Sequence, residues 1–329
     1  MIEVKHLSKT YTTFERGHTL REVVKTLVHR PMKEIRAVDD ISFTIEQGEM
    51  VAFLGPNGAG KSTTLKMLTG VLHPSAGEVT CLGLVPWKQR RQYVRRVGAV
   101  FGQKSQLIWD IPPSDAFYMN KAIYGVPDKE YNETLDELVE LLQVGDIMRK
   151  PTRQLSLGER MKCEFIMAML HRPELVFLDE PTIGLDMIAK ESIRSFIRRM
   201  NERKITFILT THDLEDVELL AERVMVINHG KIVVDDALSG LRSRLGAKKS
   251  VRLTTEQPVP DELPPGLRLL QRSGPLELEL EIDTDVLPLK PFISHFNESY
   301  GILDMAIEAL PIEAVMKQLY TTDHAKEHA

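Results

Sequence analysis

The stretch GPNGAGKST (55–63) constrains the fold more than any other part of the sequence. It follows the apolar run EMVAFLG (49–55) and opens a segment in which Leu65, Leu68 and Leu72 recur at helical spacing. The motif matches G-x-x-x-x-G-K-[ST], and a strand before it with a helix after it is the context of a phosphate-binding loop, or P-loop. This unit predicts the start of an α/β domain.

The residue types of this loop suit phosphate binding. Glycines let backbone N–H groups turn toward a β-phosphate without a Cβ clash. The ammonium of Lys61 is expected beside the β- and γ-phosphates, and the hydroxyl of Ser62 is a ligand for Mg²⁺. A glycine-rich turn without a ligand is the alternative. The predicted nucleotide-binding residues of the loop are Gly55, Asn57, Gly58, Ala59, Gly60, Lys61, Ser62 and Thr63.

A second apolar run, LVFLDE (175–180), ends in two carboxylates. Ligands of a parallel sheet bind at the carboxyl ends of its strands. Asp179 is therefore predicted to hold the metal ion. Glu180 would point into the same crevice, where it can orient or deprotonate the attacking water.

The stretch LSLGER (155–160) has two interpretations. Ser156 and Glu159 have the spacing of a capping box, which would only start a helix. Ser156 and Gly158 also place a hydroxyl and a bare backbone at a helix N-terminus, where anions bind. The local sequence leaves both open.

Five motifs in order give a family resemblance: GPNGAGKST, Gln103 after VGAVFG, LSLGER, LVFLDEP, and His212 after ILTTH. Residues 1 to about 236 resemble the nucleotide-binding subunit of an ATP-binding cassette (ABC) transporter. The resemblance implies a P-loop NTPase cassette with an inserted helical subdomain. It also implies an ATPase that uses ATP and Mg²⁺.

Further roles follow only from this resemblance. Gln103 resembles the glutamine that reaches Mg²⁺ and faces the membrane subunits, and His212 the switch histidine that contacts the γ-phosphate and Glu180. Asp186 resembles the aspartate that crosses the dimer interface. Tyr11 resembles the aromatic residue that stacks on adenine.

The resemblance also implies that LSLGER acts across a dimer. Such cassettes pair head to tail, so Ser156 and Gly158 would contact nucleotide held by the partner. The usual family signature is Leu-Ser-Gly-Gly-Gln, whereas this sequence has Leu157 for the first glycine and Glu159 for the glutamine. We expect the contact in trans to be weaker or tuned, with the Leu157 side chain turned away from the nucleotide.

The predicted domains are an ABC ATPase domain at 1–239, with helical signals at about 104–170, and a small accessory α/β domain at 240–329. The second domain, a βαβ-containing sandwich, resembles the domain that follows cassettes of ABC-2-type exporters. The cassette strands are expected at 2–8, 41–46, 49–55, 174–180, 204–212 and 223–236. The tail is expected to hold three strand-like stretches (SVRLTTE, GLRLLQR and LELELEI), helices near 289–298 and 311–320, and a strand near 302–308.

An inserted segment at 12–36 separates the first two strands. Its helical apolar face is Leu20, Val23, Val24, Leu27 and Val28, with a basic rim of Arg21, Lys25, His29 and Arg30. This face either packs on its own domain or contacts a membrane subunit or lipid headgroups.

Composition limits the remaining classes. The 329 residues, 27% of them charged, fit a soluble two-domain protein with net charge −5, and Cys81 and Cys163 give no disulfide framework or metal spacing. No apolar run approaches the roughly 20 residues of a membrane span. If the protein acts at a membrane, another chain must therefore supply the spans.

We therefore predict the ATPase subunit of an ABC exporter at the cytoplasmic face of the plasma membrane. Its expected partners are integral-membrane permease subunits and a second ABC ATPase subunit, with no nucleic acid. An importer ATPase is one alternative. A soluble cassette acting on nucleic acid or the ribosome is the other, and the run KQRRQYVRR (88–96) is interpreted as a solvated face rather than support for it.

Overall fold

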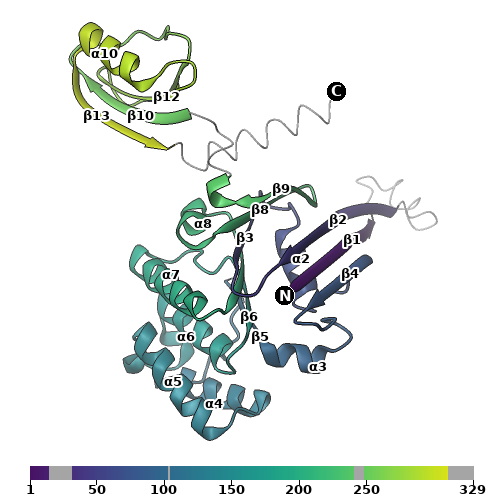
Figure 1. The fold of residues 1–329 in the computed structure, drawn as a ribbon. Coiled ribbons are helices and arrows are strands. Elements are labelled where there is room, and N and C mark those ends of the chain that lie inside the picture. Colours follow the sequence, from purple (N-terminus) through teal and green to yellow (C-terminus); the bar gives the residue numbers. More distant parts are fainter. Residues whose placement is uncertain (15–31, 103, 241–247, 310–329) are drawn as a thin grey trace, which may run out of the picture. The chain divides into compact units, whose positions relative to one another are not determined.

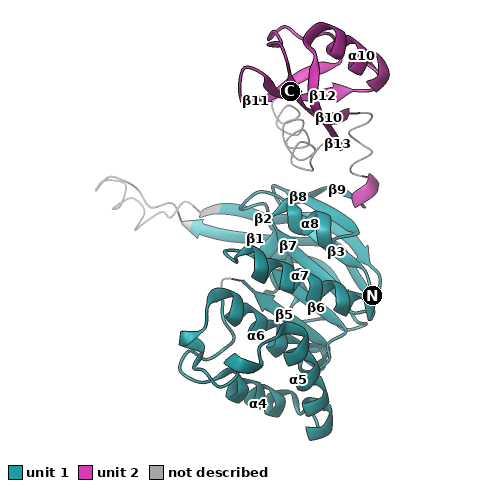
Figure 2. Cartoon of the chain, turned by 90° about the vertical axis from the view of Figure 1, so that its left-hand side faces the viewer, with its two compact units in different colours: residues 1–235 teal, residues 236–329 magenta. Residues whose placement is uncertain are grey.

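The computed structural model describes residues 1–14, 32–102, 104–240 and 248–309. Its contacts divide the chain into two compact units, Met1–Asp235 and Asp236–Ala329 (Figure 2). The domain bounds predicted above, with a boundary at 239/240, remain a proposal.

The first unit is built on a six-stranded sheet in the order β5-β6-β7-β3-β8-β9 (Figure 1). β3 pairs in parallel with β7 and β8, and β6 pairs in parallel with β5 and β7. The predicted α/β P-loop fold is therefore confirmed. The strands are β3 (Met50–Leu54), β5 (Val97–Phe101), β6 (Leu175–Asp179), β7 (Thr206–Thr211), β8 (Arg223–Asn228) and β9 (Lys231–Ala237).

This sheet is covered on both faces, as its continuous apolar strands require. In β6, Leu175 and Phe177 pack in one hydrophobic cluster, whereas Val176 and Leu178 pack in the other. Since side chains alternate along a strand, the two clusters lie on opposite faces.

Helices contribute residues to both clusters. The cluster with Val176 contains residues of α4, α5, α6 and α7, and the cluster with Leu175 contains residues of α2. Between the P-loop helix and β6, α4 to α6 form the predicted helical insertion (Figure 1). The helices are α2 (Lys61–Leu68), α3 (Arg90–Tyr93), α4 (Pro113–Tyr124), α5 (Asp128–Leu142), α6 (Leu157–Met169), α7 (Met187–Glu202) and α8 (Leu214–Leu220).

A three-stranded antiparallel sheet, β2-β1-β4, belongs to the second cluster. It consists of β1 (Ile2–Phe14), β2 (Met32–Ile45) and β4 (Ala76–Cys81). The first two strands are longer than predicted, so residues 12–14 and 32–36 are strand ends rather than parts of an inserted helix. Cross-strand pairing of Tyr11 with Ile35 and of Thr12 with Glu34 extends the ladder. The predicted helical face from Leu20 to Val28 lies outside the described residues.

The second unit contains an antiparallel sheet in the order β11-β12-β10-β13 and the helix α10. β12 and β13 both run antiparallel to β10, so they are parallel to each other, and α10 connects them as a βαβ unit. Leu278, Leu280 and Ile282 face the core with Phe292 and Phe296 of α10. The elements are β10 (Lys248–Thr255), β11 (Leu267–Arg272), β12 (Glu277–Asp283), α10 (Leu289–Tyr300) and β13 (Ile302–Ala309). The predicted helix at 311–320 lies outside the described residues.

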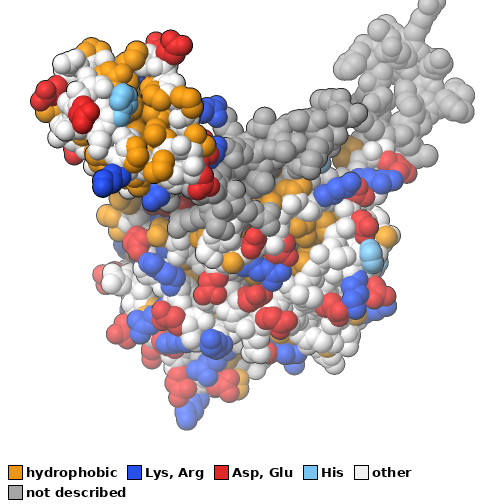
Figure 3. Space-filling view, turned by 45° about the horizontal axis from the view of Figure 1, so that its top comes forward, with side chains coloured by type: hydrophobic (Ala, Val, Ile, Leu, Met, Phe, Trp, Pro, Cys, Tyr) orange, Lys and Arg blue, Asp and Glu red, His pale blue; other side chains and the backbone are white. Residues whose placement is uncertain are grey.

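The structure bears on two of the predictions, that this chain has no membrane span and that the basic run at 88–96 is a solvated face. Within the described ranges, no helix is long and apolar enough to cross a membrane. In the basic run at 88–96, Tyr93 is fully buried and Arg96 pairs with Glu174 at 2.6 Å. On the face turned to the viewer in Figure 3, basic and acidic side chains are interspersed among the described residues.

Candidate functional site

The P-loop runs from the end of β3 to the start of α2, and its glycines are required by close backbone approaches. A Cβ on Gly55 would lie 2.1 Å from the carbonyl oxygen of Ile227. At Gly60, which has a φ of +108°, a Cβ would lie 2.4 Å from the carbonyl oxygen of Ala37. The neighbouring strands therefore fix the loop, and its end is the N-terminus of α2, where anions are favoured.

Lys61 is buried within this loop. Its ammonium donates to the carbonyl oxygens of Gly55, at 2.6 Å, and Pro56, at 3.1 Å. Burial lowers the pKa of Lys61, and the negative charges of Glu180 and Asp179 oppose that shift. A desolvated ammonium of this kind is complemented by an anion such as a phosphate.

Asp179 joins the P-loop helix to the sheet. Its Oδ1 accepts hydrogen bonds from the Ser62 hydroxyl at 2.9 Å and the Thr210 hydroxyl at 2.5 Å. The sequence interpretation missed Thr210, although it lies in the ILTTH motif, two residues before His212. The hydroxyl and carboxylate predicted to hold Mg²⁺ are thus adjacent.

The donor atoms of this site fit a hard divalent cation. Oxygen atoms of Ser62 and Asp179 suit Mg²⁺, which usually keeps water and substrate phosphates as its other ligands. Among the described residues, no group of three or more His, Cys, Asp and Glu could hold a metal ion, so a site made wholly of such side chains is absent there. Gln103, the third predicted ligand, lies outside the described residues.

Glu180 and His212 extend from neighbouring strand ends. The Glu180 N–H donates to the carbonyl oxygen of Thr210 at 2.9 Å, and Glu180 has a φ of +52°. Its Oε1 lies 3.1 Å from Nδ1 of His212. The predicted contact between these two side chains is therefore present in the structure.

One cavity of about 630 Å³ unites most of these groups. Its size is that of a small-ligand site. The sequence interpretation did not single out Lys66, although it lies one helical turn beyond Ser62, nor the apolar walls of the cavity. The lining residues are Asn57, Ser62, Lys66, Val71, Phe101, Lys104, Asp179, Glu180, Ile183 and His212.

LSLGER, by contrast, is not part of this cavity. Ser156 Oγ accepts from the Glu159 N–H at 3.2 Å, and Glu159 Oε2 accepts from the Ser156 N–H at 2.8 Å, so the predicted capping box is present. The hydrogen bond from the Ser156 backbone lowers the pKa of Glu159. A Cβ on Gly158 would lie 2.8 Å from Cβ of Ala189, which gives this glycine a packing role as well.

Asp186 and Tyr11 also lie outside the cavity lining. Asp186 caps α7, because its Oδ1 accepts from the Ala189 N–H at 2.8 Å. Tyr11 is exposed, with the ammonium of Lys9 5.4 Å from its ring centroid. Neither geometry assigns a nucleotide contact within this chain.

The chain is similar to known proteins over the cassette. The family model described as "ABC transporter" matches residues 38–183. NatA of Bacillus subtilis, an ABC transporter ATP-binding protein, is 32% identical over 209 residues, which are 64% of this chain and 85% of NatA. The linearmycin resistance ATP-binding protein LnrL of Bacillus subtilis is 30% identical over 249 residues, or 75% of this chain and 79% of LnrL.

A solved structure supports the fold. The ATP-binding subunit of an ABC transporter matches with a TM-score of 0.62 and 24% identity, covering 74% of this chain and 93% of that chain. The P-loop, the strand-end carboxylates and these similarities agree. The chain therefore belongs to the ABC transporter ATP-binding proteins, the ATPases of these transporters.

Proposed function

We propose that this chain is the ATPase subunit of an ABC exporter of the ABC-2 type. The observation that carries the hydrolytic role is the single cavity in which Ser62, Asp179, Glu180 and His212 meet beside the P-loop. Lys61 and the α2 N-terminus would hold the β- and γ-phosphates. The similar proteins support a role in a transporter, and the residues that line the cavity support ATP hydrolysis.

Each side chain has a role that its position supports. Ser62 and Asp179, with Gln103, would hold Mg²⁺, which when bound neutralises charge on the phosphates. The Glu180 carboxylate accepts a hydrogen bond from the attacking water and takes its proton. His212 holds that carboxylate in place from the next strand, and its exposed ring can reach the γ-phosphate.

We further propose that the signature works in a dimer. Ser156 and Leu157 are exposed, and neither they nor Gly158 line the cavity of their own chain. Next to them, at the start of α7, Met187 and Ile188 are 85% and 82% exposed. Apolar side chains this exposed, at the α7 start beside the signature, suit burial by a second ATPase subunit.

The exporter assignment rests on the relatives and the tail. The alignment with LnrL spans 249 residues, more than the first unit contains, and that relative is a resistance protein by name. We propose that permease subunits supply the membrane spans and hold this chain at the cytoplasmic face of the plasma membrane. An importer with the same cassette is the alternative.

The test is co-purification of the tagged chain from membranes of its native host. Recovery of membrane-spanning chains supports the proposal, whereas recovery of ribosomal proteins or nucleic acid in their place contradicts it. Direction is tested in a strain whose chain carries Glu180→Gln. An exporter predicts greater sensitivity to toxic organic compounds than in the wild type, and an importer predicts dependence on an added nutrient.

A further inference from the structure

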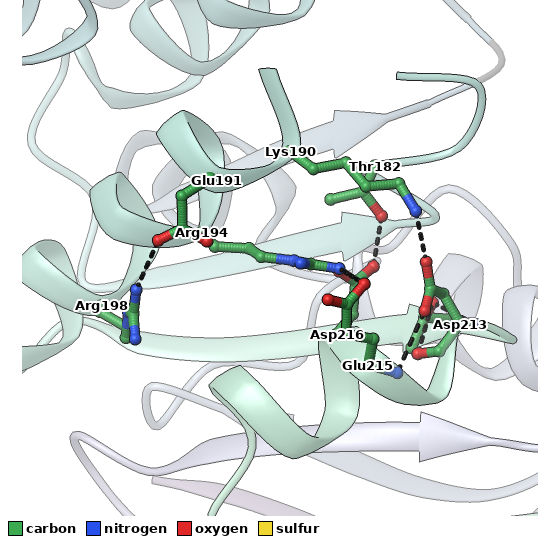
Figure 4. A network of polar contacts seen from close by, with 9 residues as sticks. Thr182, Lys190, Glu191, Arg194, Arg198, Asp213, Glu215 and Asp216 are labelled. Atoms are coloured by element: carbon green, nitrogen blue, oxygen red, sulfur yellow. Dashed lines mark hydrogen bonds and ion pairs between the residues drawn. The ribbon is translucent and has the colours of Figure 1, made fainter. Parts of the chain in front are cut away.

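The loop that bears His212 is held from outside the cavity by helix α7. The Lys190 ammonium lies 2.6 Å from Oδ2 of Asp213, the residue directly after His212 (Figure 4). Asp213 is also the N-cap of α8, with Oδ1 accepting from the Glu215 N–H at 3.1 Å. One carboxylate therefore joins the start of α7 to the start of α8.

This ion pair is partly buried, and each partner neutralises the charge of the other. The Lys190 and Asp213 side chains are 24% and 27% exposed. Burial acts to raise the pKa of Asp213, but the hydrogen bond and charge of Lys190 outweigh it, so this pKa lies below its ordinary value. The Asp213 carboxylate consequently stays ionised at neutral pH.

A second group of contacts also connects α7 to α8. The Arg194 guanidinium lies 2.6 Å from Oδ1 of Asp216, and the Thr182 hydroxyl donates to the other oxygen of the same carboxylate (Figure 4). Arg194 and Asp216 are both buried. Thr182 follows Glu180 by two residues, and Asp216 lies in α8, the helix that follows His212. These contacts therefore connect α7 to the segments that carry Glu180 and His212.

Lys190, unlike Arg194, also lines a cavity together with the site residues. A small cavity of about 100 Å³ is lined by Lys190 and Asp213 together with Glu180 and His212. The His212 ring itself is more than half exposed, so packing alone does not fix it. The backbone that follows His212 is held by the contacts of Asp213.

We propose that Lys190 is a positioning residue for ATP hydrolysis, which acts through Asp213 to hold His212 within reach of Glu180. The inference rests on the proposed function, in which His212 and Glu180 act on the same reaction. The same turn of α7 contains the exposed Met187 and Ile188, so a subunit that contacts them would bear on His212 through Lys190.

The test compares Lys190→Met with a matched control on the same helix. Arg198 pairs with Glu191 at 3.0 Å and both are about half exposed, so Arg198→Met removes one ion pair of α7 away from the site. Lys190→Met should lower kcat by about 10-fold to 100-fold, the cost of misplacing a catalytic group by a fraction of an ångström to an ångström. KM for ATP and the melting temperature should stay near those of Arg198→Met, and Lys190→Arg should restore most of kcat.

Non-additivity separates positioning from a structural role. In a His212→Ala background, Lys190→Met should cause no further loss of kcat, because its effect passes through His212. An equal loss in both backgrounds, or an unchanged kcat in the single variant, overturns the inference. If Lys190→Met does not fold, Asp213→Asn, which keeps the α8 cap, decides the question by the same criteria.

The outcomes also distinguish this inference from the proposed function. If His212→Ala alone leaves ATPase activity unchanged, the proposed role of His212 fails first. If His212→Ala lowers the activity and neither Lys190→Met nor Asp213→Asn does, only the positioning role of Lys190 fails.

Discussion

Nδ1 of His212 lies 3.1 Å from Oε1 of Glu180, and each residue directly follows the end of its own parallel strand. The register explains this proximity, because Asp179 in β6 is paired with Thr210 in β7. Glu180 and His212 are one residue and two residues beyond that pair. Two motifs 32 residues apart in sequence therefore meet at one edge of the sheet.

Glu180→Gln should keep ATP binding and slow hydrolysis by about 10²–10⁴-fold, the usual effect of losing a general base. The amide keeps the shape of the side chain but cannot take the proton of the water. The variant should then accumulate as an ATP-bound dimer, measured by light scattering after size exclusion. Full activity together with a monomer in ATP would count against both roles.

Lys61→Ala should abolish ATPase activity, since the ammonium of Lys61 is the cation that the P-loop itself provides. Burial lowers the pKa of Lys61, so keeping its ammonium charged in the absence of nucleotide lowers the free energy of unfolding. Lys61→Met, which retains the apolar stem, should accordingly melt no lower than the wild type without ATP. Near-normal hydrolysis in either variant would remove the P-loop assignment.

Mixing two defective subunits tests the signature in trans. A Ser156→Arg chain keeps its P-loop, and a Lys61→Ala chain keeps its signature. Together they form one complete site, so partial ATPase activity should return on mixing if the chain homodimerises. A verified mixed dimer without activity would leave Ser156 as a helix cap only.

The sequence predicted those parts of the fold and site that depend on local pattern. GPNGAGKST predicts the phosphate-binding loop, and LVFLDE predicts a strand with two acids at its end. The arrangement of the strands then brings the Ser62 hydroxyl to 2.9 Å from Asp179. The capping box of Ser156 and Glu159 is likewise a local property, and both of its hydrogen bonds are present.

Features that depend on partners distant in sequence could not be predicted. β1 and β2 extend beyond their predicted ends because residues far apart in the sequence, such as Tyr11 and Ile35, pair with each other, which no local pattern encodes. The neighbours of Lys190 are also non-local, since Asp213 is 23 residues away. A lysine in a helix gives no signal of the carboxylate it will meet.

Gly158 offers a test that separates packing from phosphate contact. A Cβ at this position would lie 2.8 Å from Cβ of Ala189, so Gly158→Ala forces α6 and α7 apart. We expect a loss of about 1–3 kcal/mol in the free energy of unfolding, typical of overpacking. Adding Ala189→Gly should restore stability. If ATPase activity stays low in the restored double variant, Gly158 has a functional role beyond packing.

His171 should make the stability of the chain depend on pH. Nε2 donates to the carbonyl oxygen of Val97 at 2.9 Å, the ring stacks on Tyr124 with centroids 4.0 Å apart, and the buried Nδ1 has no partner among the described residues. A second proton would have to be placed on that buried nitrogen. Burial therefore lowers the pKa of His171 below its ordinary value of 6.5.

The sign of the effect follows from proton uptake. Below about pH 6.5 the unfolded chain binds more protons at this histidine than the folded chain does, so the free energy of unfolding decreases as the pH decreases, by at most about 1.4 kcal/mol per pH unit. Above pH 6.5 the residue contributes no slope. His171→Gln keeps a donor for Val97 but cannot titrate. Denaturant unfolding of both proteins between pH 7.5 and 5.5 should show their stability difference shrinking as the pH falls, and a constant difference would contradict the buried, neutral state of His171.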